Sequence, residues 1–329
     1  MSFDWQTEGK TVWEDAPSQP PTPKSRRGRW VVLAAALVLL ATAVLFQGLR
    51  QRLAQVAGQV EADVLASHAV IHEAAVRGDG EVVLSFLSGR DAGWASATGQ
   101  LAAGGLTYGR EGLNLAWLPG QSAAPSVVLG ADLQSAEVTQ GESYAIDVGN
   151  GLTETVVLGQ TAVYRLGNNR WLLSPPEAEF WGASRTILGQ YLVVHFPTRD
   201  AAVVERLFLR LDDKLGQMCT QLPNFTCPPG FQVDVVFSTE PAALAQANLV
   251  GVITTKQAGL RLPTPTLVGL PQSEAAFQAL FRGYASLVVA TAVTDLVDWR
   301  CCEEVDFYQV LLNDLLSQLG LRPNPTAER

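Results

Sequence analysis

The sequence has little charge, few histidines and few cysteines. Charged residues make up 17% of its 329 residues, and 23 basic against 32 acidic side chains give a net charge of -9. Nucleic-acid binders neutralise phosphates with a basic face, so this acidic composition excludes a general nucleic-acid partner. With 47% hydrophobic residues, the chain is too apolar to be disordered. Its length predicts about two domains.

Signatures of catalysis are missing as well. The chain contains no G-x-S-x-G nucleophile elbow and no glycine-rich phosphate loop. Its histidines are His68, His72 and His195. The first two lie one helical turn apart, but a zinc site would need a third ligand from elsewhere. We therefore predict no catalytic residue, no metal and no cofactor, and packing roles for His68 and His195.

One long apolar run determines the expected compartment. Residues 30–49 read WVVLAAALVLLATAVLFQGL and carry no charge. A helix of this length spans about 30 Å, the thickness of a bilayer core. The run exceeds the apolar region of a signal peptide, and no small-x-small cleavage site follows it. It is interpreted as an uncleaved signal anchor; a cleaved signal peptide and a buried core helix are the alternatives.

The flanking charges predict the orientation of this anchor. Basic residues precede the run at Lys24, Arg26, Arg27 and Arg29, whereas only Arg50 and Arg52 follow closely. The positive-inside rule then places the N-terminus in the cytoplasm and the rest of a single-pass membrane protein outside it. The four cysteines all follow the run, on the side where disulfides persist.

The cysteines allow three pairings. Cys219 and Cys227 are eight positions apart and bracket a turn, so we favour a disulfide between them. Cys301 and Cys302 would then be vicinal cysteines, as a strained bridge or two thiols. In the rival pairing, one of these two reaches the 219–227 loop.

Both ends of the chain are expected to lack fixed structure. Residues 1–29 contain four prolines between positions 17 and 23, which predicts a disordered cytoplasmic tail. Its aromatic residues Phe3, Trp5 and Trp13 suggest a cytoplasmic protein partner; the alternative is a solvated tail with a stop-transfer basic cluster. Residues 321–329 are expected to form a mobile tail.

Residues 51–182 predict helices followed by an antiparallel sheet. Apolar positions recur at helical spacing at Val60, Val64, His68, Ile71 and Ala75. Asp91 is expected to cap a short helix that carries Trp94. Alternating, β-branched segments follow at Ser126–Val138, Ser143–Val148, Thr153–Leu166 and Arg170–Leu173. Separate helices and strands indicate an α+β fold.

A second α+β domain is predicted over 186–320, after the connector EAEFWGAS. We expect strands at Tyr191–Phe196 and Phe231–Phe237, with a helix capped by Thr198 between them. Ser273 is expected to cap a long helix to about Leu296, apolar on several sides and therefore buried. A last helix is expected at about Val305–Leu319.

The segment Ala162–Leu173, with its polar turn followed by Arg170-Trp171, resembles the last hairpin of the NTF2-like (SnoaL-like) family. The resemblance covers roughly residues 54–182 and implies a cone of helices and a curved sheet around a cavity. Trp94, Trp117 and Tyr164 are candidates for its wall, and packing in the core is the alternative reading. That family includes enzymes, binding modules and structural ectodomains, so the fold does not determine the function.

The second domain resembles zincin-type peptidase-like domains. Active members need H-E-x-x-H, and the corresponding helix here, FQALFRGYASLVVATAV, contains no histidine. The resemblance therefore implies a degenerate, peptidase-like domain. As a whole, the chain resembles bacterial single-pass membrane proteins.

These features predict a membrane-anchored extracytoplasmic protein with the lipid bilayer as a partner. Because catalytic motifs are missing, a non-catalytic role in sensing, scaffolding or interaction is favoured. A small-molecule-binding or enzymatic role of the NTF2-like cavity is the alternative, and a hydrolase related to peptidases ranks third.

Overall fold

The computed structural model describes residues 26–149, 151–222, 226–254, 259–297 and 305–322. The chain divides into two units, Met1–Val56 and Ala57–Arg329. The predicted cytoplasmic tail up to position 25, with Lys24, lies outside the described residues. The same holds for Cys301, Cys302 and the end of the chain from position 323.

The first unit contains the beginning of helix α1 (Arg26–Val76). Its apolar side chains are exposed, with 61% for Leu37, 69% for Leu39 and 73% for Leu45. The helix is apolar and long enough to cross a bilayer, as the sequence predicts. A helix with this exposed apolar surface suits a lipid environment better than water.

In the second unit, the rest of α1 carries the predicted apolar stripe, and Val64, Ile71 and Ala75 are buried. Two short helices follow: α2 (Gly80–Ser85) and α3 (Ala92–Ala103). The Asp91 side chain accepts a hydrogen bond from the Trp94 amide, which confirms the predicted cap.

The first sheet is antiparallel and contains β1 (Ala116–Trp117), β2 (Ser126–Leu129), β3 (Ser135–Gly149), β4 (Leu152–Gly167), β5 (Arg170–Leu173) and, from far along the chain, β10 (Leu270–Pro271). Its central order is β1-β3-β4-β10; β2 pairs with β3, and β5 with β4. A short 3-10 helix, η1 (Glu111–Leu113), precedes β1.

The predicted strand over Ser126–Val138 is wrong in its extent, because a turn interrupts it. Asp132 accepts hydrogen bonds from the Gln134 amide and the Ser135 hydroxyl, and Leu133 adopts a φ of 54°. The chain then continues as one strand, β3, through the predicted gap before Ser143. Strand β5 matches its predicted bounds, and left-handed Asn168 and Asn169 make the turn before it.

The second sheet has the order β6-β7-β8-β9, with β6 (Ser184–Leu188), β7 (Leu192–Pro197), β8 (Val233–Ser238) and β9 (Leu260–Pro263). Strands β7, β8 and β9 are parallel, and β6 is antiparallel to β7. Helix α5 (Ala201–Gln221) connects β7 to β8; α6 (Ala243–Gln246) and α7 (Leu249–Thr254) lie between β8 and β9. The segment EAEFWGAS, which the sequence predicts as a connector, instead forms helix α4 (Ala178–Trp181) and the beginning of edge strand β6.

Thr198 does not cap the helix after β7, contrary to the prediction. It begins a 3-10 turn, η2 (Thr198–Asp200), and its hydroxyl donates to the Ala183 carbonyl. Asp200 holds the N-cap position of α5 instead. Its buried carboxylate accepts from the amide and the hydroxyl of Thr266, at 2.9 and 2.7 Å, and ties α5 to α8 (Pro265–Val268).

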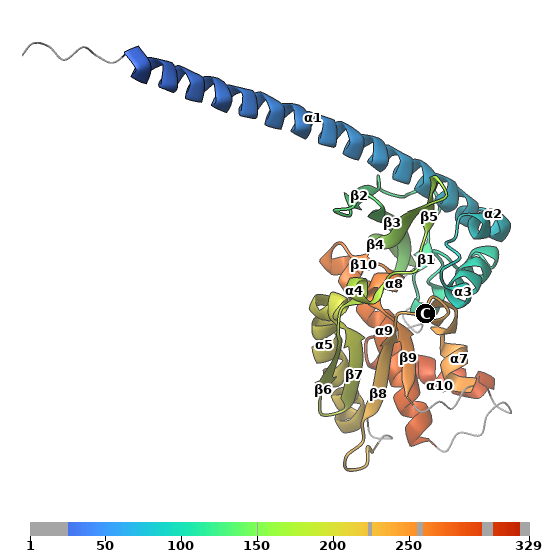
Figure 1. Cartoon of the computed structure of the whole chain (residues 1–329). Helices are drawn as coiled ribbons and strands as arrows, with labels where there is room; N and C mark the ends of the chain where they lie inside the picture. The colour runs from blue at the N-terminus through green and yellow to red at the C-terminus, as the bar shows by residue number, and fades with distance from the viewer. Residues whose placement is uncertain (1–25, 150, 223–225, 255–258, 298–304, 323–329) are drawn as a thin grey trace, which may run out of the picture. The chain divides into compact units, whose positions relative to one another are not determined.

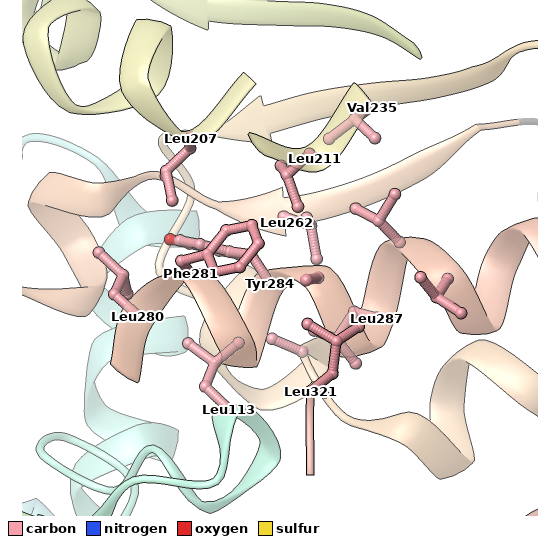
Figure 2. Packing of buried hydrophobic residues seen from close by; sticks show 14 of the residues in the cluster. Leu113, Leu207, Leu211, Val235, Leu262, Leu280, Phe281, Tyr284, Leu287 and Leu321 are labelled. Atoms are coloured by element: carbon pink, nitrogen blue, oxygen red, sulfur yellow. The ribbon is translucent and has the colours of Figure 1, made fainter. Parts of the chain in front are cut away.

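Helix α9 (Glu274–Leu296) is the buried helix that the sequence predicts, and Ser273 caps it by accepting from the Ala276 amide. Figure 2 shows α9 between two groups of side chains, with Leu207 and Leu211 of α5 on one side and Leu113 of η1 on the other. Helix α10 (Val305–Gln318) follows. Residues of both sheets belong to this one core, and Figure 1 shows the elements that contribute to it.

Cys219, near the end of α5, and Cys227 lie at disulfide distance, with Cα atoms 5.3 Å apart. Changing both to serine is expected to lower the free energy of unfolding by about 2.5 kcal/mol, because the open loop gains entropy in the unfolded chain. Denaturant unfolding of the full chain, with and without reductant, measures this difference. Reductant should destabilise the native chain but leave the double variant unchanged; equal sensitivity of both would contradict the assignment.

Candidate functional site: a cavity between the two sheets

A cavity of about 150 Å³ lies between the first sheet with its helices and the segments that follow β8 and β9. From the first sheet and its helices come His68, Trp94, Tyr108 and Tyr164. Beyond the second sheet, Leu244 of α6, which follows β8, and Leu267 of α8, which follows β9, complete the wall. This part of the wall lies beyond the carboxyl ends of two parallel strands, where open α/β sheets commonly bind ligands.

His68 is the buried polar group of the α1 stripe. Its Nε2 lies 2.5 Å from the Gln140 side-chain oxygen, and its Nδ1 lies 2.8 Å from the Tyr164 hydroxyl. An amide oxygen only accepts, so Nε2 carries the proton and the Tyr164 hydroxyl donates to Nδ1. Burial lowers the pKa of His68, which favours the neutral imidazole at this wall.

A second polar cluster centres on Glu142 of β3, whose side chain is fully buried. The carboxylate accepts from His72 Nε2 at 2.9 Å, from Trp117 Nε1 at 3.0 Å and from the Ser122 hydroxyl at 3.0 Å. Burial by itself would raise the pKa of Glu142, but the hydrogen bonds from these groups outweigh it and hold the pKa below its ordinary value. Neither His72 nor Glu142 is among the described residues that line the cavity.

Glu142 should therefore stabilise the fold in its charged form. Glu142→Gln is expected to lower the free energy of unfolding at pH 7 by about 2 kcal/mol, because charge-assisted hydrogen bonds are lost. A group with a depressed pKa contributes stability above its unfolded pKa, and this contribution is lost as the pH falls through the folded pKa.

The difference in the free energy of unfolding between the wild type and Glu142→Gln should therefore disappear in acid, below the ordinary carboxyl pKa of 4.5. Denaturant unfolding of the full chain at several pH values measures this difference. Glu154→Gln, at an exposed position of β4, is the matched control. A difference in the free energy of unfolding that stays constant from pH 7 to pH 3 would contradict a charged Glu142 side chain.

Arg110 closes one end of the cavity and is 4% exposed. Its Nε donates to the Val268 carbonyl at 3.0 Å, and its Nη2 donates to the Leu267 carbonyl at 3.0 Å. Nη1 donates to three carbonyls of its own loop, the shortest at 2.7 Å to Gly109. A further contact of 3.4 Å joins Nη2 to Gln160 of β4. All the guanidinium donors are used, and they connect the loop, β4 and α8.

The structure places two of the three predicted wall residues, Trp94 and Tyr164, on the cavity. Trp117 does not line it; its indole is turned to Glu142. Sequence reasoning missed Tyr108 and Arg110, which lie in a glycine-rich segment without periodicity. The side chains of Arg26, Arg27 and Arg29 are not among those described.

Within the described part of the chain, no group of three His, Cys, Asp or Glu side chains could hold a metal. His195 lies in strand β7. Its Nδ1 is hydrogen-bonded to the Thr186 hydroxyl on the neighbouring strand β6, at 2.9 Å. No family model matches the chain, and no match to it was found among curated proteins or solved structures.

Proposed function

We propose that this chain is a membrane-anchored protein whose extracytoplasmic part binds a small molecule in the cavity, in a sensing role without catalysis. The first unit supplies an apolar helix for the anchor. The basic cluster before it favours a cytoplasmic N-terminus, and the cysteine pair at 219 and 227 suits an oxidising compartment outside.

The cavity is the observation that carries this proposal. Small-molecule sites have apolar walls with a few placed polar groups, and here Trp94, Leu244 and Leu267 accompany His68 and Tyr108. A cavity of about 150 Å³ is large enough for a molecule of the size of benzene. The His72–Glu142 pair does not reach the wall, which favours binding over acid–base chemistry.

A cavity-filling variant tests the binding. Ala75 is buried on the wall, so Ala75→Leu fills part of the space. Full-length protein in lipid nanodiscs should bind 4-fluorotoluene, as followed by ¹⁹F NMR, and Ala75→Leu should abolish the binding. Ala69→Leu, at an exposed position of the same helix, is the control. Equal binding by both variants would contradict a site in this cavity.

Reporter fusions test the orientation. A fusion at the C-terminus should be active only outside the cytoplasm. Changing Lys24, Arg26, Arg27 and Arg29 to asparagine should invert a measurable fraction of the chains, because Arg50 and Arg52 would then dominate. A C-terminal reporter active only in the cytoplasm would contradict the proposed compartment.

A further inference from the structure

Several hydroxyl groups of the cavity wall have no hydrogen-bond partner among the described residues. The Oγ1 atoms of Thr98 and Thr107 are buried and unpaired. The hydroxyl of Tyr108, a half-buried residue of the same wall, makes no hydrogen bond to a described residue either, although it is not one of the fully buried atoms. Buried hydroxyls normally find a partner because leaving them unpaired costs free energy. The wall thus holds hydrogen-bonding capacity that the fold does not use.

Tyr108 is held by several contacts. Its ring contacts two aromatic rings, with centroids 5.0 Å from His72 and 5.3 Å from Trp117. The Tyr144 hydroxyl donates to the Tyr108 carbonyl at 3.0 Å and fixes the backbone. The two ring contacts restrict the rotamer, so the phenol is a donor held in place before any ligand arrives. Burial raises the pKa of Tyr108 well above its usual value, so the phenol keeps its proton.

The charges around the cavity exclude a charged ligand. The donors of Arg110 are already taken by carbonyl and amide oxygens. Glu142 lies off the wall and is bound by three donors. An ionic group in this space would lose its hydration without gaining a direct partner, which is strongly unfavourable.

We propose that the ligand is an uncharged ring compound of about the size of phenol that carries a hydrogen-bond-accepting oxygen, and that the Tyr108 hydroxyl is the donor that selects it. This inference rests on the proposed binding function. It adds a ligand class and a specificity-determining residue, which the cavity alone does not give. Thr98 and Thr107 lie on the same wall, but their hydroxyl oxygens are fully buried, so Tyr108 is the donor that the proposal uses.

Two probes of equal size test the selection. 4-Fluorophenol and 4-fluorotoluene differ by a hydroxyl in place of a methyl group. With full-length protein in nanodiscs, and empty nanodiscs as the blank, ¹⁹F NMR titration should give a Kd about tenfold lower for 4-fluorophenol. Tyr108→Phe should remove this difference and leave the Kd of 4-fluorotoluene within about twofold. Tyr191→Phe, whose hydroxyl bonds to Gln190 away from the cavity, should behave like the wild type.

The outcomes separate the two proposals. If 4-fluorotoluene binds but 4-fluorophenol binds no tighter, or if Tyr108→Phe keeps the difference, the ligand class is wrong while the binding function stands. If neither probe binds the wild type, both proposals fail. 4-Fluorobenzoate should bind at least about tenfold more weakly than 4-fluorophenol; equal or tighter binding would overturn the uncharged class.

Discussion

Replacing Arg110 with leucine is expected to lower the free energy of unfolding by about 4 kcal/mol, the largest effect expected of any change at the cavity. The guanidinium is buried and donates to the carbonyls of Val268, Leu267 and Gly109. Leucine has a similar apolar stem and no donors, so the Leu267 and Gly109 carbonyls would remain unpaired, while Val268 would keep only its hydrogen bond from Gln160. Since Val268 and Leu267 belong to α8, the variant should also loosen this short helix against β4.

Denaturant unfolding of the full chain measures the effect of Arg110→Leu. Hydrogen exchange should report faster opening at 265–271 than elsewhere. Arg261→Leu, at an exposed position of β9, is the control and should change stability by less than about 0.5 kcal/mol. A loss below about 1 kcal/mol at Arg110 would mean that its hydrogen bonds do not hold the loop, β4 and α8 together.

Replacing Gly112 with alanine is the second large effect, at about 3 kcal/mol. A Cβ atom at this position of η1 would lie 1.8 Å from the Ala247 carbonyl oxygen. This neighbour is backbone, so relief requires η1 and the segment after α6 to separate. On the other side, Gly283 of α9 leaves room for the Leu113 backbone, because a Cβ there would lie 2.6 Å from the Leu113 carbonyl oxygen. The chain thus has little freedom to move aside.

The thermal unfolding midpoint of the full chain measures the effect of Gly112→Ala. Gly89→Ala is the matched control, since a Cβ at that position meets no atom within 4 Å. The midpoint of Gly112→Ala should fall by several degrees relative to the control. An unchanged midpoint would show that η1 and the segment after α6 do not pack as closely as the structure has them.

The elements determined by local chemistry could be predicted from the sequence. Asp91 and Ser273 cap the helices that they precede, and the helix that follows Ser273 is buried as expected. In each case, a side chain acts on residues a few positions away. The turn at Asn168 and Asn169 belongs to the same class, because both residues tolerate positive φ.

The elements that depend on distant partners could not be predicted. Strand β6 is mostly exposed and has no apolar alternation, so its pairing with β7 leaves no local pattern. The sequence predicts a break between Val138 and Ser143, inside strand β3, because Gln140 and Glu142 interrupt its apolar pattern. The two side chains bond to buried His68 and half-buried His72, a reason that appears only when α1 is packed on the sheet. The pairing of β10 with β4 joins segments more than a hundred positions apart.

The candidate site also depends on partners that are distant in the sequence. Trp94 and Tyr164, which the family resemblance predicts for the wall of an NTF2-like cavity, line the cavity described above, whereas the Trp117 indole donates to Glu142. The opposite wall, with Leu244 and Leu267, comes from the region that sequence reasoning treated as a separate domain. A cavity shared by two regions cannot be recognised from either region alone.

The most direct test of this account is to locate a ligand atom in the protein. Crystals of the full-length chain grown with 4-bromotoluene would place the bromine by anomalous scattering. The account predicts one peak between His68, Trp94 and Leu267, with residues of the first sheet and of α6 or α8 in contact with the ring. A cavity filled by side chains, or a bromine bound only outside it, would contradict the account.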